Sequence, residues 1–305
     1  MSGNPTLEFW LERLGQLRPE HAKKQERGLA PHKPLLLLVL LDLAEEGRLK
    51  SPEVELNADL SFRFAIYWKV AAERRRTQPE VRLPFFHLRT SGFWTPLDAS
   101  GRSADARATA TTAKLNPEFH RCLGDAEFRR LARRKLVAKW FELPAERIAL
   151  YSMLDMAVPS KDVVEADAKL GEAAAAKARG REGRFRSVVL PAYDYTCALT
   201  GYRLNTPSDY LVDAAHIHQF KRGGSNEPQN GLALSKNSHW LFDRGLWSIS
   251  DDFRVIVTSA SFEESGPEAL LLRNMAGRPI RLPDRPDLQP DPRHLAWHRQ
   301  HVLRK

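Results

Sequence analysis

The sequence predicts an α+β protein with a mainly helical N-terminal part that contains a β-hairpin, a helical linker, and a C-terminal part of short strands, an extended loop and a helix. Its 305 residues suffice for two ordinary domains, each with its own core. In the first half, apolar residues recur at helical spacing. After residue 185 the apolar segments become shorter and turn residues separate them, which is typical of strands and loops.

Three helices are expected at the start of the chain. "PTLEFWLERLGQL" repeats Leu7, Trp10, Leu14 and Leu17 along one helical face. "KPLLLLVLLDLAEEGRL" predicts a buried helix that stops at a glycine, Gly47, and its apolar run is too short to span a membrane. "NADLSFRFAIYWKVAAERRR" predicts a third helix, which ends in a triple arginine at residues 74–76.

The middle of the first half changes character. "VRLPFFHLRTSGFWTPL", residues 81–97, is rich in aromatics and contains Pro84 and Gly92, so we expect a strand, a turn and a second strand. Residues 117–141 return to a helical pattern with Phe128, Leu131 and Leu136 facing inward. Its basic residues are expected to face mostly outward, and they are Arg129, Arg130, Arg133, Arg134 and Lys135.

Residues 158–185, "VPSKDVVEADAKLGEAAAAKARGREGRF", are rich in alanine and charge and contain few large apolar residues. That composition indicates a solvated connecting helix more than a core element. We therefore predict an N-terminal domain over residues 1–155, a linker helix over 156–184 and a C-terminal domain over 185–305. The last stretch is proline-rich and leads into a short basic helix.

Composition limits the partners and the compartment. Lys and Arg number 47 against 38 Asp and Glu, so the net charge is +9, which favours an anionic partner such as nucleic acid, although a basic surface can serve solubility alone. No run of eighteen apolar residues and no signal peptide are present, so we expect a soluble, cytoplasmic protein without a membrane partner. Two distant cysteines, Cys122 and Cys197, provide neither a disulfide framework nor a structural zinc site.

The chemistry is concentrated in the C-terminal part. "YLVDAAHIHQF" predicts a strand with His216, "KRGGSNEPQNGLAL" an extended loop with Asn230, and "SKNSHWLFDRG" a helix that stops at Gly245. His239 and Asp243 lie one helical turn apart and therefore point from the same face. An imidazole and a carboxylate so placed can bind a hard or borderline divalent cation.

This order of strand His, loop Asn and helix His resembles the HNH nucleases with their ββα-metal core. The resemblance spans roughly residues 184–249, and the flanks "FRSVVLPAYDYTCALTG" and "HWLFDRG" are similar to its restriction-type branch. It implies that His216 is the general base, that Asn230 holds the loop and orients this base, and that His239 and Asp243 bind the metal. The implied cofactor is Mg²⁺ or Mn²⁺, with Ni²⁺ and Co²⁺ as alternatives, and no structural zinc.

The chain departs from that family at one position. Many relatives have an acid or a histidine directly before the general base, where this chain has Ala215. Asp213 lies two residues earlier, on the same strand face as Ala215, so it is the predicted third metal ligand. His218 shares the face of His216 and could contact a phosphate, support the site or lie on plain surface. Asp243 could instead cap its helix or pair with its neighbour Arg244.

The N-terminal half carries a second resemblance. "APHKPLLLLVLLDL" and "RLPFFHLRTSGFWTPL" are similar to the sulfur-binding domain of restriction endonucleases that attack phosphorothioate-modified DNA, over roughly residues 5–150. Sulfur is larger and more weakly hydrated than oxygen, so an apolar cavity rimmed by cations can select it. Leu83 replaces the aromatic that relatives have there. The implied contacts are His32, Lys33, Arg74, Arg75, Arg82, Leu83, Pro84, Phe85, His87 and Arg89, with Arg76 as a further cation.

Together, the two resemblances imply a modification-dependent, type IV-like restriction endonuclease. An N-terminal DNA-reading domain would recognise phosphorothioate-modified double-stranded DNA, and a helical linker would join it to a ββα-metal (HNH) nuclease domain. Two alternatives stay open, namely an HNH nuclease that recognises a methylated base or an unmodified sequence, and an inactive DNA-binding regulator. A homodimer is one way for such a nuclease to cut both strands. The arginine and lysine clusters at 129–135 and 177–186 are either solvated or contact phosphates.

Overall fold

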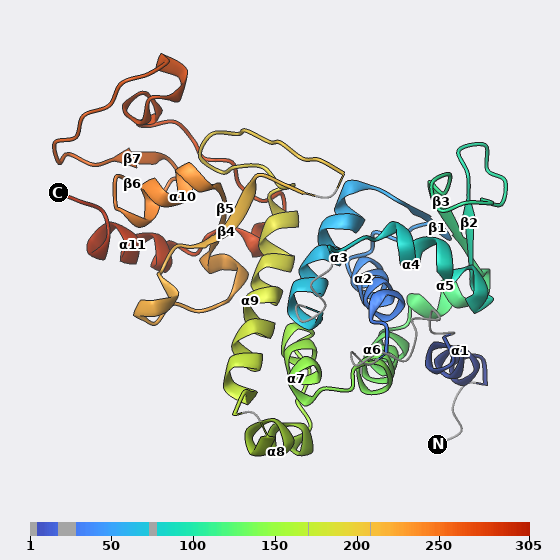
Figure 1. Cartoon of the computed structure of the whole chain (residues 1–305). Helices are drawn as coiled ribbons and strands as arrows, with labels where there is room; N and C mark the ends of the chain where they lie inside the picture. The colour runs from blue at the N-terminus through green and yellow to red at the C-terminus, as the bar shows by residue number, and fades with distance from the viewer. Residues whose placement is uncertain (1–4, 18–28, 73–77, 170, 208) are drawn as a thin grey trace. The chain divides into compact units, whose positions relative to one another are not determined.

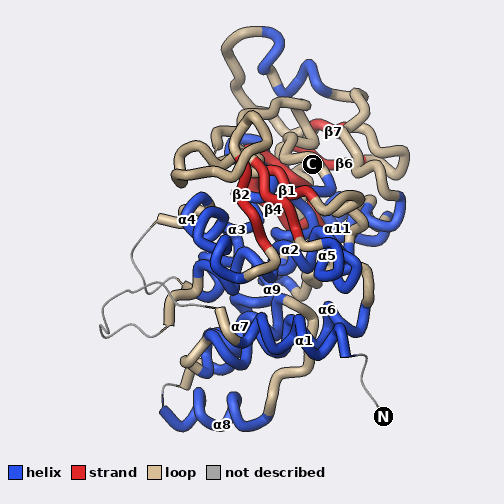
Figure 2. The backbone as a smooth tube through the Cα atoms, turned by 90° about the vertical axis from the view of Figure 1, so that its right-hand side faces the viewer, coloured by secondary structure: helices blue, strands red, loops and turns tan. Residues whose placement is uncertain are grey.

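The computed structural model describes residues 5–17, 29–72, 78–169, 171–207 and 209–305. The chain divides into two compact units, Met1–Gly183 and Arg184–Lys305, and Figure 1 traces their elements in chain order. Helices dominate the described residues, and the strands are short (Figure 2). The predicted mixed fold, with a mainly helical N-terminal part, is confirmed. Among these residues, no helix is long and apolar enough to cross a membrane.

The helices of the first unit surround α2, His32–Glu45, which is buried over most of its length because it is apolar on nearly every side. It ends as predicted at Gly47, whose φ is 69°. The other helices of this unit, in chain order, are α1 (Pro5–Gly15), α3 (Ala58–Ala71), α4 (Arg82–His87), α5 (Pro117–Leu123), α6 (Ala126–Trp140), α7 (Pro144–Met153), α8 (Ser160–Lys169) and the start of α9 (Ala173–Ala192). Of these, α3, α4, α5 and α6 pack directly against α2.

A small antiparallel sheet lies in this unit, with the strand order β1 (Glu53–Glu55), β3 (Thr112–Leu115), β2 (Trp94–Leu97). Strands β2 and β3 form a hairpin with Trp94 opposite Leu115, so the partner of β2 lies at residues 112–115 and not within residues 81–97, where it was predicted. The predicted first strand within residues 81–97 is wrong, because residues 82–87 form α4. Pro84 lies in the first turn of that helix, where its missing N–H leaves no hydrogen bond unmade.

One basic residue of α6 is buried where we expected it to face mostly outward. The Arg133 side chain is 9% exposed, and its Nη2 donates to Asp42 at 2.8 Å and to Glu45 at 2.7 Å. Tyr67 donates its hydroxyl to the same Asp42 at 2.6 Å, and burial raises the pKa of this aspartate. A charge that is buried needs such partners, so Arg133 links α6 to α2, and Asp42 in turn links α2 to Tyr67 of α3.

The alanine-rich stretch packs more tightly than its composition predicts. Ala166, Ala173 and Ala176 are buried. At Gly180, an added Cβ would lie only 2.2 Å from the carbonyl oxygen of Ala149. Small side chains here permit close approach of α9 to α7, so α8 and the start of α9 pack on the first unit along one face and leave their other residues exposed.

The second unit is built around a strand pair and a helix. Strands β4 (Val212–His216) and β5 (Gly231–Ser235) are antiparallel, and β5 leads directly into α10 (Lys236–Asp243). The strands β6 (Trp247–Ile249) and β7 (Val255–Val257) pair with each other, and α11 (Pro292–His301) is the predicted C-terminal basic helix. Short 3-10 turns connect them at η3 (Phe220–Arg222), η4 (Pro228–Asn230), η5 (Glu268–Leu270), η6 (Leu272–Met275) and η7 (Pro286–Leu288), while η2 (Leu88–Ser91) follows α4 in the first unit.

Candidate active site

His216 ends β4, where it pairs with Gly231 of β5. Its ring stacks on that of Phe185, with centroids 4.1 Å apart and planes only 6° from parallel. The glycine makes this possible, because a Cβ at Gly231 would lie 2.9 Å from the Phe185 ring and 2.5 Å from Val189. The imidazole is thus held against an apolar surface while its edge stays partly exposed.

Asn226 fixes the orientation of the same ring. Its Oδ1 lies 2.8 Å from His216 Nε2, so the imidazole donates from Nε2 and, when neutral, carries its lone pair on Nδ1. Nothing in the sequence singled out Asn226. A loop amide ten residues after the histidine carries no periodic signal, and only the folded loop shows which of its polar side chains faces His216.

Asn230 holds the loop that follows His216. Its side chain is fully buried, and its Oδ1 accepts a hydrogen bond from the backbone N–H of His218 at 2.7 Å. Its Nδ2 donates to the carbonyl oxygens of His218 at 3.0 Å and Ser225 at 2.8 Å. One amide therefore ties together both ends of residues 218–225, which is the geometry that a loop-holding role requires.

His239 and Asp243 project from α10 as predicted. His239 Nε2 lies 3.4 Å from Asp243 Oδ2, and the side chains are 29% and 47% exposed. Ser235 caps the start of this helix, and Gly245, with φ at 67°, follows its end. Arg244 places its guanidinium over the Trp240 ring. A nitrogen and a carboxylate oxygen on one open face suit a divalent cation whose remaining ligands would be water or phosphate oxygens.

Asp213 has a different environment. Its Oδ1 lies 3.1 Å from Arg186 Nη1 of α9. Within the described part of the chain, no group of three or more His, Cys, Asp or Glu side chains is placed to hold a metal ion together. The structure therefore brings His239 and Asp243 together and does not bring Asp213 to them.

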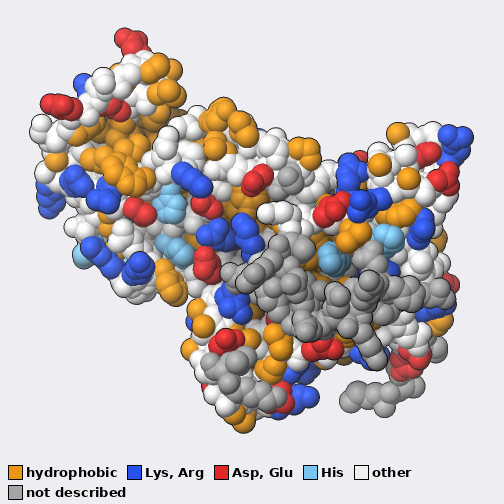
Figure 3. Space-filling view, viewed as in Figure 1, with side chains coloured by type: hydrophobic (Ala, Val, Ile, Leu, Met, Phe, Trp, Pro, Cys, Tyr) orange, Lys and Arg blue, Asp and Glu red, His pale blue; other side chains and the backbone are white. Residues whose placement is uncertain are grey.

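His218 packs against the C-terminal helix. Its ring stacks on Trp297 of α11 at 3.8 Å, and its Nε2 lies 3.1 Å from the carbonyl oxygen of Arg222. On the face drawn in Figure 3, histidine side chains reach the surface over the region of β4 and α10, where Lys and Arg side chains lie together with some Asp and Glu side chains. The Lys and Arg side chains there suit a phosphate backbone.

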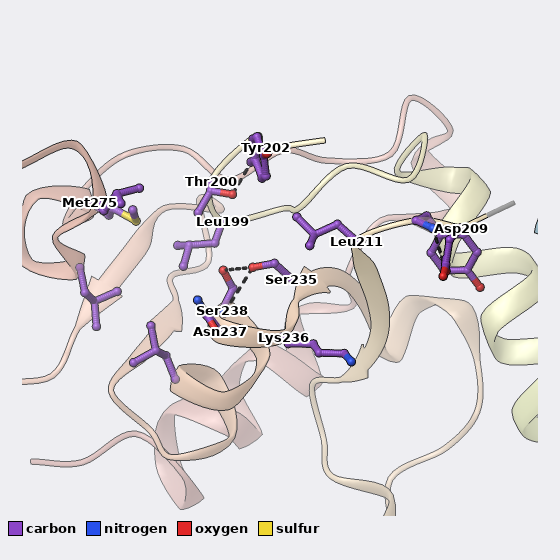
Figure 4. A pocket seen from close by; sticks show the side chains of 14 residues that line it. Leu199, Thr200, Tyr202, Asp209, Leu211, Ser235, Lys236, Asn237, Ser238 and Met275 are labelled. Carbon is purple, nitrogen blue, oxygen red and sulfur yellow. Dashed lines mark hydrogen bonds between the residues drawn. The ribbon is translucent and has the colours of Figure 1, made fainter. Parts of the chain in front are cut away.

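A cavity of about 680 Å³ lies beside the start of α10 (Figure 4). Neither His216, Asn230, His239 nor Asp243 lines it. Asn230 is buried, whereas His216, His239 and Asp243 are half-buried or exposed, so this cavity is separate from the candidate catalytic residues. The cavity is lined mainly by Leu199, Tyr202, Tyr210, Leu211, Leu241, Leu270, Leu272 and Met275, with Ser235 and Ser238 at its floor.

The apolar residues predicted to contact sulfur are mostly buried in the first unit. Phe85 is fully buried, with its ring 5.1 Å from Trp94, whose Nε1 donates to the Phe85 carbonyl oxygen. Pro84 is buried beside it, whereas Leu83 is half-buried. Phe85 is therefore a core residue of α4, and Leu83 presents the larger accessible apolar surface.

The predicted cationic contacts are spread over α2 and the region of α4, two helices that pack together. His32 begins α2 with its ring 4.7 Å from that of Trp68, and Lys33 follows it, half-buried. Arg89 places its guanidinium 4.0 Å from the centre of the Phe86 ring. Arg82 is exposed and His87 half-buried, while Arg74, Arg75 and Arg76 lie outside the described residues.

Comparison with known proteins gives a matching family and several similar solved structures, two of which are described here. Residues 197–250 match the HNH endonuclease family. The modification-dependent restriction endonuclease TagI is 24% identical over 39% of this chain and 37% of its own, with a TM-score of 0.32, so the chain spans little more than a third of that protein. The sulfur-binding domain of SprMcrA, solved with phosphorothioated DNA, is 18% identical over 49% of this chain and 95% of its own, with a TM-score of 0.38. No curated protein matches the chain.

Proposed function

We propose that this chain, whose residues 197–250 form an HNH endonuclease domain, is a modification-dependent DNA endonuclease. In this proposal the Met1–Gly183 unit recognises phosphorothioate-modified duplex DNA and the Arg184–Lys305 unit hydrolyses its phosphodiester bonds. One observation carries the nuclease part. The imidazole of His216, held in one orientation, lies at the end of β4, and Asn230 holds the loop that follows this strand. The neighbouring helix α10 presents His239 and Asp243 on one face.

The proposed chemistry follows from these contacts. His216 takes a proton from the water that attacks the phosphorus, and Asn226 keeps the ring in one orientation while it does so. Asn230 keeps the loop, and with it the base, in place. HNH nucleases generally use a divalent metal ion, and when bound by His239 and Asp243 it would offset the charge that grows on the phosphate. Mg²⁺ or Mn²⁺ suits this pair, and Asp213 stays a prediction as a further ligand.

The recognition part rests on the first unit. Its candidate surface combines the half-buried Leu83 with the cations Lys33, Arg82 and Arg89. An apolar contact accepts a weakly hydrated sulfur at little cost but leaves a well-hydrated oxygen without its water, and neighbouring cations balance the phosphate charge. The net charge of +9 supports a polyanionic partner.

Recognition is tested by presenting the protein with matched duplexes that are unmodified, phosphorothioate-modified or base-methylated, in Mg²⁺ or Mn²⁺. We expect binding and cleavage of the phosphorothioate duplex at least about tenfold above the unmodified one, a difference of about 1.4 kcal/mol. Leu83→Asp should remove the preference, whereas Thr90→Ala, an exposed change in the following turn, should retain it. Equal cleavage of all duplexes would refute the proposed recognition of phosphorothioate. Preferential cleavage of methylated DNA would show that the first unit recognises a modified base instead.

A further inference from the structure

The C-terminal helix α11 lies outside the residues that match the HNH family, yet it contacts the helix that carries the metal-binding pair. Its His298 is 1% exposed and stacks on the ring of Phe242, with centroids 3.7 Å apart and planes 6° from parallel. Phe242 directly precedes Asp243 on α10. A fully buried histidine thus packs on the residue next to a predicted metal ligand.

Both ring nitrogens of His298 are used. Nε2 lies 3.2 Å from the carbonyl oxygen of Phe242, and Nδ1 lies 2.9 Å from Ser248 Oγ. A carbonyl can only accept, so Nε2 donates to it and Nδ1 accepts from the serine hydroxyl. Burial keeps the ring neutral by lowering its pKa to about 4. The last turn of α10 is therefore joined to α11 and β6 through one imidazole.

The residues after α11 hold the same end of α10. The backbone N–H of Arg304 donates to the carbonyl oxygen of Gly245 at 3.0 Å. Thr258 donates its hydroxyl to the carbonyl oxygen of Arg304 at 2.7 Å. The carbonyl oxygen of Val302 lies so close to Gly245 that an added Cβ would approach it to 1.9 Å. The C-terminal segment thus fits closely around the residue that ends the metal-binding helix.

On its other side, α11 contacts the loop that follows the base. Trp297 stacks on His218 at 3.8 Å, and Arg222 Nη1 lies 3.4 Å from the carbonyl oxygen of His301. The backbone of His218 is itself held by Asn230. A single helix therefore touches both the loop of the base and the helix of the metal-binding pair.

We infer that His298 is a positioning residue for the His239–Asp243 pair, and that α11 braces α10 against the loop that follows His216. This inference rests on the proposed nuclease function. An eight-residue helix has little stability of its own, so tertiary contacts must set where its last turn lies. Because His239 and Asp243 are one turn apart, a shift of that last turn changes the geometry that they offer a cation.

The test uses three variants of the full chain: His298→Ala, His298→Gln, and the control Gln300→Ala, which changes an exposed residue of the same helix. Calorimetry measures Mn²⁺ binding, and circular dichroism checks folding. The cleavage rate is measured as a function of Mn²⁺ concentration. His298→Ala should raise the Mn²⁺ dissociation constant at least about tenfold, as loss of a supporting contact commonly does. Its cleavage should recover at high Mn²⁺.

The glutamine variant distinguishes positioning from mere folding. A Gln amide can donate to Phe242 and accept from Ser248, so it should restore Mn²⁺ affinity to within about threefold of wild type. If His298→Ala does not fold, Ser248→Ala removes one of the two bonds and should weaken Mn²⁺ binding severalfold. If a folded His298→Ala or Ser248→Ala variant binds Mn²⁺ with wild-type affinity, the inference about His298 is overturned, but the proposed function is not. A wild-type protein that neither binds Mn²⁺ nor cuts DNA would overturn the proposed function and the inference with it.

Discussion

His216 is held from three sides before any substrate arrives. The Phe185 ring supports its face, Asn226 fixes its Nε2, and the loop that follows it is tied by Asn230. A base whose ring cannot turn needs no reorganisation when a water has to be deprotonated, and such preorganisation is how proton transfer becomes efficient. At the scale of single residues, the proposed base is therefore held in one orientation, while the proposed metal-binding pair is partly exposed.

The two aspartates of the site are predicted to differ in their effect on metal dependence. Asp243→Ala should raise the Mn²⁺ concentration for half-maximal cleavage at least about tenfold, because it removes one of the two adjacent donors. Asp213→Ala should have a smaller effect, because this carboxylate faces Arg186 at 3.1 Å. Titrating cleavage activity with Mn²⁺ measures both. Equal shifts would instead establish Asp213 as a ligand of the same rank.

The sequence was most informative where residue type and spacing together limit the chemistry. The spacing of His216, Asn230 and His239 was sufficient to predict an HNH domain, and the family match confirms it. Asn226 and His298 could not be predicted in the same way. One acts from an irregular loop and the other from a helix that follows the family match by more than forty residues, so their roles depend on contacts that only the fold brings about.

At the scale of elements, long apolar helices were predictable and the short aromatic segment was not. The helix over residues 32–45 follows from its nearly continuous leucines, whereas residues 82–87 have the aromatics and the proline of a strand boundary and nevertheless form α4. Packing against α2 buries Phe85 and Phe86 and decides in favour of the helix. Tertiary burial likewise drew Arg133 inward against the expectation from its basic neighbours.

The end of α10 gives a matched pair of glycine substitutions. Gly245 and Gly201 both have φ at 67°, but an added Cβ meets the Val302 carbonyl at Gly245 and nothing within 4 Å at Gly201. Gly201→Ala should therefore cost only the backbone strain of about 1 kcal/mol. Gly245→Ala should cost at least about 1 to 2 kcal/mol more, because the C-terminal segment must shift. Urea denaturation measures both, and equal losses would show that this segment does not pack on α10.

At the scale of the whole molecule, the chain combines a helical unit with its own core and a second unit built on β4, β5 and α10. The net charge of +9 follows from composition and supports a nucleic-acid partner for the chain as a whole. The modification that we propose the first unit to recognise could not be deduced from composition. Its recognition depends on whether Leu83 and its cationic neighbours present a surface that fits sulfur.

The stability of the Arg184–Lys305 unit should depend on pH through His298. Burial and the nearby Arg299 lower the pKa of this ring from its ordinary 6.5 to about 4. Between these two pH values the ring is therefore neutral in the folded unit and protonated in the unfolded chain. Its stabilising contribution is therefore full above about pH 6.5 and is lost as pH falls towards 4, by about 3 kcal/mol at most. Urea denaturation at pH 7 and at about pH 4.5 should show a smaller decrease for His298→Gln than for wild type. Identical decreases would assign the pH dependence to other groups.

The most direct test of the account compares wild type with His216→Ala in Mn²⁺ on a phosphorothioate-modified duplex, with binding and cleavage measured on the same samples. Loss of a general base should lower the cleavage rate by about 10²- to 10⁴-fold. Binding should change by less than about threefold, because DNA recognition is proposed for the other unit. Cleavage by His216→Ala at the wild-type rate, or a wild-type protein that binds DNA and never cuts it, would contradict the assignment of His216 as the base of a working nuclease.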